Sequence, residues 1–274
     1  MGLATLLGLR PRGFFIPHRH ADRVVRDGYP SLEAPFAARA GAFLDLLAEI
    51  DGWVPNLLAM RGPAPAPRLD QDWFPALDAA AAYAIVRRTK PQRIVEVGSG
   101  HSTRFLARAI ADSGLATRMT CIDPAPRASL DGLGIEWLPL LMQDAPEKCF
   151  TGLQPGDILF VDSSHVLMPG TDVDRLLNQV LPDLAPGTIV HIHDIFLPDP
   201  YPESWAWRGY NEQSAIAALL QGEAYELLFA SHYVVSRHGD RLAGAALAAL
   251  PDLASTFASS LWLQKGYSGR ALIR

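Results

Sequence analysis

The chain of 274 residues has little lysine, little cysteine and no long apolar run. Its lysines are Lys90, Lys148 and Lys265, and its formal net charge is −5. Because phosphate backbones require a basic surface, this charge balance argues against nucleic acid as a partner. No apolar stretch approaches the roughly 18 residues that span a bilayer. We therefore expect neither a nucleic acid nor a membrane as partner.

The two cysteines, Cys121 and Cys149, have neither the spacing of a metal site nor the number of a disulfide framework. The opening segment carries no basic leader and no small-residue cleavage site, so we expect no signal peptide. These features are typical of a cytoplasmic protein. An apolar content of 49% and a charged content of 19% predict a globular chain rather than a disordered one.

One stretch, RIVEVGSGHST at residues 93–103, predicts a buried strand that turns through two glycines into a helix. Its β-branched apolar residues suit a strand covered on both faces. Gly98 and Gly100 permit a close approach of the backbone to a ligand, and Ser102 or Thr103 can cap the helix. Such a turn lies at the carboxyl end of a parallel sheet, where open α/β folds bind ligands.

Residues near this turn narrow the choice of ligand. The dinucleotide fingerprint is G-x-G-x-x-G, and here Thr103 stands at the third glycine position. Glu96 is awkward beside a pyrophosphate but suits a ligand with a positive amino group and a sulfonium. Asp123 ends the next predicted strand, roughly 20 residues beyond the turn, where an acid can bind ribose hydroxyls.

Strands and helices alternate along the rest of the chain, which predicts a doubly wound, mostly parallel sheet. Residues 1–70 are helical after Ser31 and end in a proline-rich linker. We expect them to form an N-terminal helical extension of a domain at residues 71–274. The other strands are expected at residues 119–123, 136–141, 157–161, 188–193, 225–230 and 260–263.

The motifs EVGSGHST, CIDP, GDILFVDSSH and GTIVHIHDIF occur in an order and spacing that resemble the class I S-adenosylmethionine-dependent methyltransferases. The resemblance covers about residues 73–265. It implies an α/β, Rossmann-like seven-stranded sheet whose last strand is antiparallel. It also implies S-adenosyl-L-methionine as the cofactor and methyl transfer to a small-molecule acceptor, with oxygen as the expected target atom.

The resemblance also implies the cofactor contacts. Glu96 and the glycine turn would surround the methionine part, and Asp123 would bind the ribose. Gln143 and Asp144 would hold the adenine amino group or lie in a solvated turn. The serine and threonine after the turn would either cap the helix or contact the cofactor carboxylate. The full expected set is Glu96, Gly98, Ser99, Gly100, Ser102, Thr103, Asp123, Gln143, Asp144 and Asp162.

Two aspartates, Asp162 and Asp194, end adjacent predicted strands and should face one crevice, unless they merely cap loops. Three of the eight histidines lie close to them in sequence: His165, His191 and His193. His191 and His193 share one face of a strand. We interpret His191 as a core residue and the other two histidines as functional.

In the catechol-type O-methyltransferases that the chain resembles, the corresponding strands supply an aspartate with a lysine base three residues later, and an Asp-Asn metal pair. Here His165 stands in place of the lysine, and Ile195 replaces the asparagine. A divalent metal is therefore possible at Asp162, Asp194 and His193, with mixed donors that suit Mn, Fe or Zn better than Mg. Without a metal, a neutral imidazole would act as the base, with His165 as the first choice and His193 as the second. The expected catalytic set is His165, His193 and Asp194.

Residues 201–213, YPESWAWRGYNEQ, should overhang this crevice. Aromatic walls with a few polar groups are typical of a small-molecule site, although a packed loop would have the same composition. Two other functions stay open: a nicotinamide-dependent oxidoreductase on a Rossmann fold and a non-catalytic cofactor-binding domain. The sequence also leaves a homo-oligomer open. The expected acceptor contacts are Trp205, Trp207, Tyr210, Asn211 and Glu212.

Overall fold

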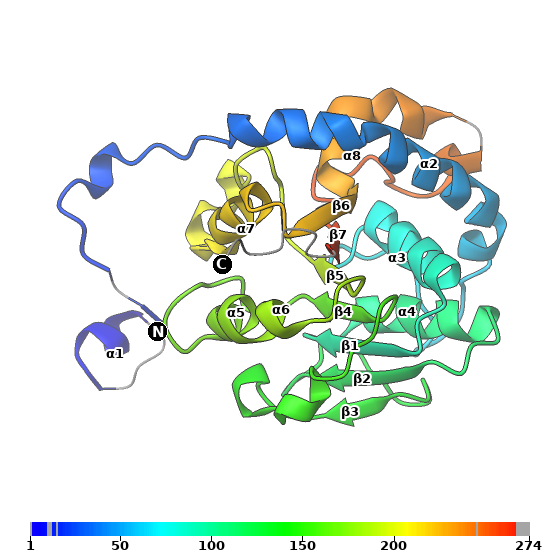
Figure 1. Ribbon diagram of the computed structural model, residues 1–274, viewed down its shortest axis with the longest axis horizontal. Coiled ribbons are helices and arrows are strands. Elements are labelled where there is room, and N and C mark those ends of the chain that lie inside the picture. The colour runs from blue at the N-terminus through cyan, green and yellow to red at the C-terminus, as the bar shows by residue number, and fades with distance from the viewer. Residues whose placement is uncertain (1, 10–12, 15, 245, 267–274) are drawn as a thin grey trace, which may run out of the picture.

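The computed structural model describes residues 2–9, 13–14, 16–244 and 246–266. Its strands are β1 (Arg93–Val97), β2 (Arg118–Ile122), β3 (Glu136–Leu138), β4 (Ile158–Val161), β5 (Ile189–Ile192), β6 (Tyr225–Ala230) and β7 (Leu261–Lys265). They form one sheet in the order β3-β2-β1-β4-β5-β7-β6 (Figure 1). All neighbouring strands are parallel except where β7 pairs with β5 and β6. This confirms the predicted mostly parallel α/β sheet with a reversed seventh strand.

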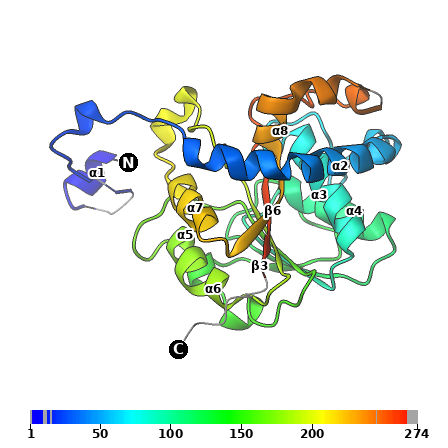
Figure 2. The same ribbon diagram turned by 45° about the horizontal axis from the view of Figure 1, so that its top comes forward.

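Helices cover both faces of the sheet (Figure 2). On one side lie α2 (Glu33–Leu58), α3 (Ala76–Thr89), α4 (His101–Asp112) and α8 (Ser231–His238), and on the other lie α5 (Asp172–Arg175), the π-helical turn η5 (Leu176–Val180), α6 (Leu181–Asp183) and α7 (Glu212–Gln221). The helix α1 (Gly2–Leu6) precedes them. The described 3₁₀ turns are η1 (Ala21–Arg23), η2 (Pro30–Leu32), η3 (Met142–Asp144), η4 (Glu147–Cys149), η6 (Glu203–Arg208), η7 (Gly239–Ala243) and η8 (Ala246–Ala249).

The long helix α2 packs on the β6 end of the sheet. Its Phe43 ring lies 6.0 Å from Phe229 of β6, and its Phe36 ring lies 5.3 Å from Tyr233 of α8. Arg39 pairs with Glu226 at 2.6 Å. From Leu32 onward the N-terminal extension thus contributes to the same apolar core as the sheet. Among the described residues, no helix combines the length and apolarity that a bilayer crossing needs.

α3 packs against α2 and α4, and its small side chains allow this close packing. The alanines at positions 79–82 are entirely buried. Asp78 lies in the same helix and is also entirely buried, although a lone carboxylate is costly to bury without partners. Its partners are the loop before β7 and a histidine after β5, as described below.

The carboxyl ends of β1, β4 and β5 meet at one edge of the sheet, as their adjacency requires. Gly98 follows β1 with φ of +80°, and a Cβ there would overlap the carbonyl oxygen of Asp162 after β4. This position therefore requires glycine, because the backbone after β1 passes so close to the backbone after β4. The same close approach brings the loops after β1 and β4 together.

Candidate functional site

A cavity of about 600 Å³ runs from the glycine turn after β1 to the ends of β4 and β5. Ser99 and Gly100 line one end, and Asp162 and Asp194 line the other. The loop at residues 69–76, the turn η6 and the segment before β7 supply the remaining walls. A ligand bound at the glycine turn could therefore reach the two aspartates without leaving the cavity.

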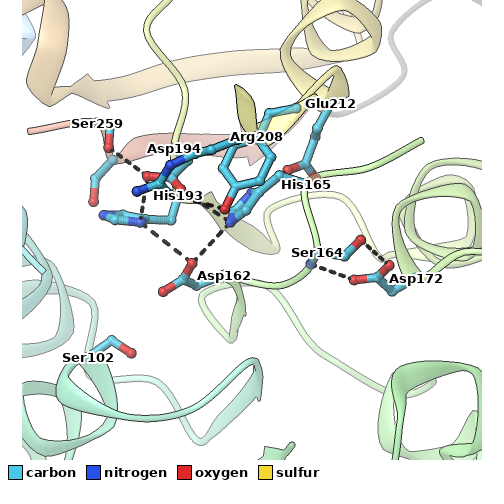
Figure 3. A network of polar contacts seen from close by, with 12 residues as sticks. Ser102, Asp162, Ser164, His165, Asp172, His193, Asp194, Arg208, Glu212 and Ser259 are labelled. Atoms are coloured by element: carbon cyan, nitrogen blue, oxygen red, sulfur yellow. Dashed lines mark hydrogen bonds and ion pairs between the residues drawn. The ribbon is translucent and has the colours of Figure 1, made fainter. Parts of the chain in front are cut away.

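Four side chains at the far end of the cavity form what we call the histidine–carboxylate cluster: Asp162, His165, His193 and Asp194 (Figure 3). The expectation that the strand ends bring them to one crevice is met by their positions. His165 and Asp194 both have left-handed backbone angles, with φ of +58° and +57°. Such angles are uncommon outside glycine and occur most often in Asn, Asp and His.

His165 lies between three carboxylates. Its Nε2 is 3.3 Å from Asp162 Oδ1 and 3.4 Å from Asp194 Oδ2. Its Nδ1 is 2.9 Å from Oε2 of Glu212, which is entirely buried at the start of α7. The backbone N–H groups of residues 211 and 212 donate to the His165 carbonyl and fix the loop. Glu212 thus orients the ring and leaves Nε2 facing the two aspartates.

His193 has the same arrangement from the other side. Its Nε2 is 3.2 Å from Asp78 Oδ2, and its Nδ1 is 3.3 Å from Asp194 Oδ1 and 3.6 Å from Asp162 Oδ1. Asp78 in turn accepts hydrogen bonds from the backbone N–H groups of Ser259 and Ser260, each at 3.0 Å. Each imidazole therefore has one nitrogen fixed by a buried carboxylate and the other directed at Asp162 and Asp194.

These carboxylates change the charge state that the sequence suggested. Burial alone would lower the pKa of His165, but its hydrogen bond to Asp162 and the charge of Asp194 outweigh burial and raise the pKa well above its ordinary value. The pKa of His193 is raised for the same reason, chiefly by the charges of Asp162 and Asp194. The expectation of an imidazole that is neutral at pH 7 is wrong for the cluster by itself, because its carboxylates stabilise the protonated form.

His191, interpreted from the sequence as a core residue, is entirely buried. Its ring stacks on Phe160 with centroids 3.6 Å apart, and its Nε2 lies 2.8 Å from Ser260 Oγ. Burial, followed by the neighbouring charge of His193, lowers its pKa well below the ordinary value. It is therefore a neutral side chain in the core beside the cluster.

Glu96 ties β1 to the first turn of α4. Ser102 Oγ donates to its Oε1 at 2.8 Å, and Thr103 Oγ1 donates to its Oε2 at 2.6 Å. Thr103 Oγ1 also accepts from the Gly100 N–H at 2.9 Å. Glu96 is entirely buried and lies outside the described lining of the cavity. Contact between Glu96 and a cofactor therefore stays a prediction. The structure shows its hydrogen bonds to Ser102 and Thr103 and to the thiol of Cys121.

The burial of Glu96 predicts how the unfolding free energy depends on pH. Burial raises its pKa to about 7, against the opposing hydrogen bonds from Thr103 and Ser102. A raised carboxyl pKa stabilises the fold below the unfolded value near 4.5, and this contribution is lost as the pH rises through about 7. Glu96→Gln is expected to remove this loss, which amounts to roughly 3 kcal/mol at 1.36 kcal/mol per pKa unit.

The measurement is the unfolding free energy of wild type and Glu96→Gln between pH 4.5 and 8. Glu147→Gln, on the exposed turn η4, is the matched control and should follow the wild-type curve. A wild-type pH profile that persists in Glu96→Gln would exclude Glu96 as its source.

Some of the other expected cofactor residues line the cavity, and others lie outside its lining. Ser99 and Ser102 line the cavity. Asp123 accepts the Ser99 N–H and the Ala125 N–H, both at 2.7 Å, and so fixes the turn from outside the described lining. Gln143 and Asp144 in η3 are exposed and also lie outside that lining.

The expected acceptor residues divide in the same way. Trp205 and Tyr210 line the cavity. Trp207 is 81% exposed and lies outside the described lining. Asn211 binds the backbone of Leu167 through both ends of its amide, at 2.6 and 3.2 Å. With Glu212 bound to His165, the structure uses both polar residues that were expected to contact the acceptor for bonds within the protein.

Residues 95–195 match the methyltransferase-domain family. Among solved structures, the chain is similar to the methyltransferase PaMTH1 of Podospora anserina bound to S-adenosylhomocysteine (SAH), with 19% identity and a TM-score of 0.46 over 93% of this chain and 100% of that one. It is also similar to an O-methyltransferase of Bacillus cereus in complex with SAH, with 16% identity and a TM-score of 0.37 over 68% and 82%.

A third similar structure is the O-methyltransferase TomG of Streptomyces achromogenes, involved in tomaymycin synthesis and in complex with S-adenosylmethionine. It is 20% identical, with a TM-score of 0.38 over 66% of this chain and 80% of that one. No curated protein matches the sequence significantly. The domain match, with the strand order and the reversed β7, supports the expectation of a class I S-adenosylmethionine-dependent methyltransferase.

Proposed function

We propose that the enzyme methylates an oxygen atom of a small molecule whose acceptor hydroxyl lies at the histidine–carboxylate cluster. The observation that carries this proposal is the single cavity that joins the glycine turn to the cluster. Methyl transfer needs the donor sulfonium and the acceptor oxygen in line, so positioning supplies much of the catalysis. No observation favours a nicotinamide reaction or a non-catalytic role.

The glycine-turn end suits the methionine part of the cofactor. Ser99 Oγ and His101 Nδ1 are buried there and have no hydrogen-bond partner within the described structure. At Gly100, a Cβ would make only an ordinary 3.5 Å contact with Arg127. The protein itself therefore does not demand glycine at this position, whereas a closely bound ligand would. S-adenosylmethionine, when bound, supplies the electrophilic methyl group.

Gly100 provides the experiment that tests this assignment. SAH is expected to bind the wild-type enzyme in the micromolar range, about −8 kcal/mol by calorimetry, and NAD is expected not to bind. Gly100→Ala should fold normally but weaken SAH about tenfold or more, because the methyl group would occupy space next to the turn. Gly41→Ala on α2, where a Cβ meets nothing within 4 Å, is the control. NAD binding without SAH binding would refute the proposed function.

The cluster also has the donors of a divalent metal site. Asp162, His165 and Asp194 each offer one ligand atom, and these atoms lie within 4.8 Å of one another. Ligating histidines typically donate their second N–H to a carboxylate, which is what Glu212 provides for His165. We propose these three ligands, with His165 in place of the His193 that the sequence suggested. A bound divalent ion would lower the pKa of the acceptor hydroxyl.

This ligand set leaves His193 as the proposed base. Its Nδ1 faces the position between Asp162 and Asp194, and Asp78 holds its other nitrogen. A base oriented by a buried carboxylate is a recurrent arrangement for removing a hydroxyl proton. A cation beside the aspartates would offset their effect on His193 and favour its neutral form. The acceptor proton would then pass to His193 Nδ1.

A further inference from the structure

The described structure gives one cation on the cavity wall no acidic partner. Arg208 ends η6 and lines the cavity. Its guanidinium carbon lies 4.0 Å from the centre of the Trp205 ring and 5.3 Å from that of Tyr210. Its Nη1 donates to the Tyr210 hydroxyl at 3.1 Å. Within the described residues, no carboxylate forms an ion pair with Arg208, and its Nε is buried without a hydrogen-bond partner.

Arg208 is close to the cluster but is not neutralised by it. Tyr210, whose hydroxyl accepts this hydrogen bond, has its ring 4.7 Å from the His165 ring. The two Asp194 oxygens face His165 and His193 at 3.4 and 3.3 Å. The guanidinium therefore keeps donors free for a ligand next to the proposed reaction centre.

The surroundings of Arg208 favour a flat ligand. Trp205 stacks on Phe257 with centroids 5.7 Å apart and an interplanar angle of 5°, and both residues line the cavity. Aromatic walls of this kind suit a planar apolar body. The planar guanidinium fork matches the two oxygens of a carboxylate better than any neutral group.

We propose that Arg208 binds a carboxylate of the methyl acceptor, so that the acceptor is a flat hydroxy acid. This inference rests on the proposed function and narrows its substrate class. The hydroxyl would lie at the histidine–carboxylate cluster, while the carboxylate would lie at Arg208. The acceptor oxygen gains the methyl group as the sulfur–carbon bond of the sulfonium donor breaks and S-adenosylhomocysteine leaves. The hydroxyl proton passes to His193, and the carboxylate is not changed.

A second arginine provides a matched control. Arg127 also lines the cavity and lacks an ion pair in the described part of the chain. Its guanidinium lies 4.2 Å from the centre of the Trp73 ring, and its backbone N–H donates to the Ser99 carbonyl at the glycine turn. It therefore offers the same charge in the same cavity, but at the cofactor end.

The test measures calorimetric binding of protocatechuate and of its methyl ester to the SAH-bound, Mn-loaded enzyme. These probes share a catechol ring and differ in one carboxylate charge. Wild type is expected to bind the acid about tenfold more tightly, the usual scale of a charge-assisted hydrogen bond. Arg208→Gln should reduce this preference to less than about twofold, Arg208→Lys should keep part of it, and Arg127→Gln should keep it fully. Melting temperatures verify that each variant is folded.

The proposal is overturned if wild type does not bind the acid more tightly than the ester, or if the preference survives Arg208→Gln. Loss of the preference in Arg127→Gln alone would place the carboxylate at the cofactor end and also overturn it. SAH binding is measured first, without either probe. Its absence would refute the proposed function, whereas a preference that depends on Arg208 with SAH bound supports both.

Discussion

Methyl transfer is expected to fall to background when a chelator removes divalent metal, and Mn is expected to restore it at least as well as Mg. The physical reason is the ligand set, because two carboxylates and one imidazole bind Mn, Fe or Zn better than Mg. Asp162, His165 and Asp194 supply these donors within 4.8 Å of one another. The measurement is the transfer rate after chelation and after titration with each ion.

Two variants separate a metal site from a purely structural cluster. His165→Ala should remove a ligand and lose activity that excess Mn does not fully restore. Glu212→Gln keeps the shape of the buried side chain that holds His165 at 2.9 Å, and it should weaken metal binding by about 10–100-fold. Full activity in excess chelator, with no metal found by elemental analysis, would contradict the metal assignment and leave the cluster to act by proton transfer alone.

The sheet was predictable because its central strands β1, β4 and β5 are short apolar runs covered on both faces. The segment between β6 and β7 was not. α8 consists of the eight residues SHYVVSRH, among which the apolar residues are too few to show a helical period. This segment nevertheless brings Phe257 to the cavity and Ser259 to Asp78. Its role depends on tertiary packing against α2, which the local sequence does not encode by itself.

The position of the cluster was predictable, since the carboxyl ends of parallel strands meet at one edge. The groups that orient it were harder to find. Asp78 is 115 residues from His193 in the chain and lies in an alanine-rich helix, where an isolated acid in an apolar face was the available signal. Arg208 was overlooked among the aromatics of its loop. The cofactor contact of Glu96 stays a prediction, and its hydrogen bonds to Ser102 and Thr103 were not foreseen.

His191 on β5 and His193 just after it allow the role of the proposed base to be tested with an internal control. His193→Gln is expected to lower turnover by about 10²–10⁴-fold, the usual contribution of a general base, while SAH affinity stays nearly unchanged. Its Nδ1 faces Asp162 and Asp194, so the variant removes the proposed proton acceptor. Turnover is measured at saturating cofactor and acceptor, with the metal content determined for each variant.

His191→Gln should give the opposite result. His191 is buried on the same sheet, stacks on Phe160 and binds Ser260, but it faces the core. This variant should lower the melting temperature and keep its turnover when folded. Asp78→Asn should lower turnover less than His193→Gln, because it disturbs the orientation of the base without removing it. Equal turnover losses in His191→Gln and His193→Gln, with equal losses of melting temperature, would show that the effect at His193 is structural. Normal turnover in His193→Gln would instead return the role of base to His165, which the sequence alone had favoured.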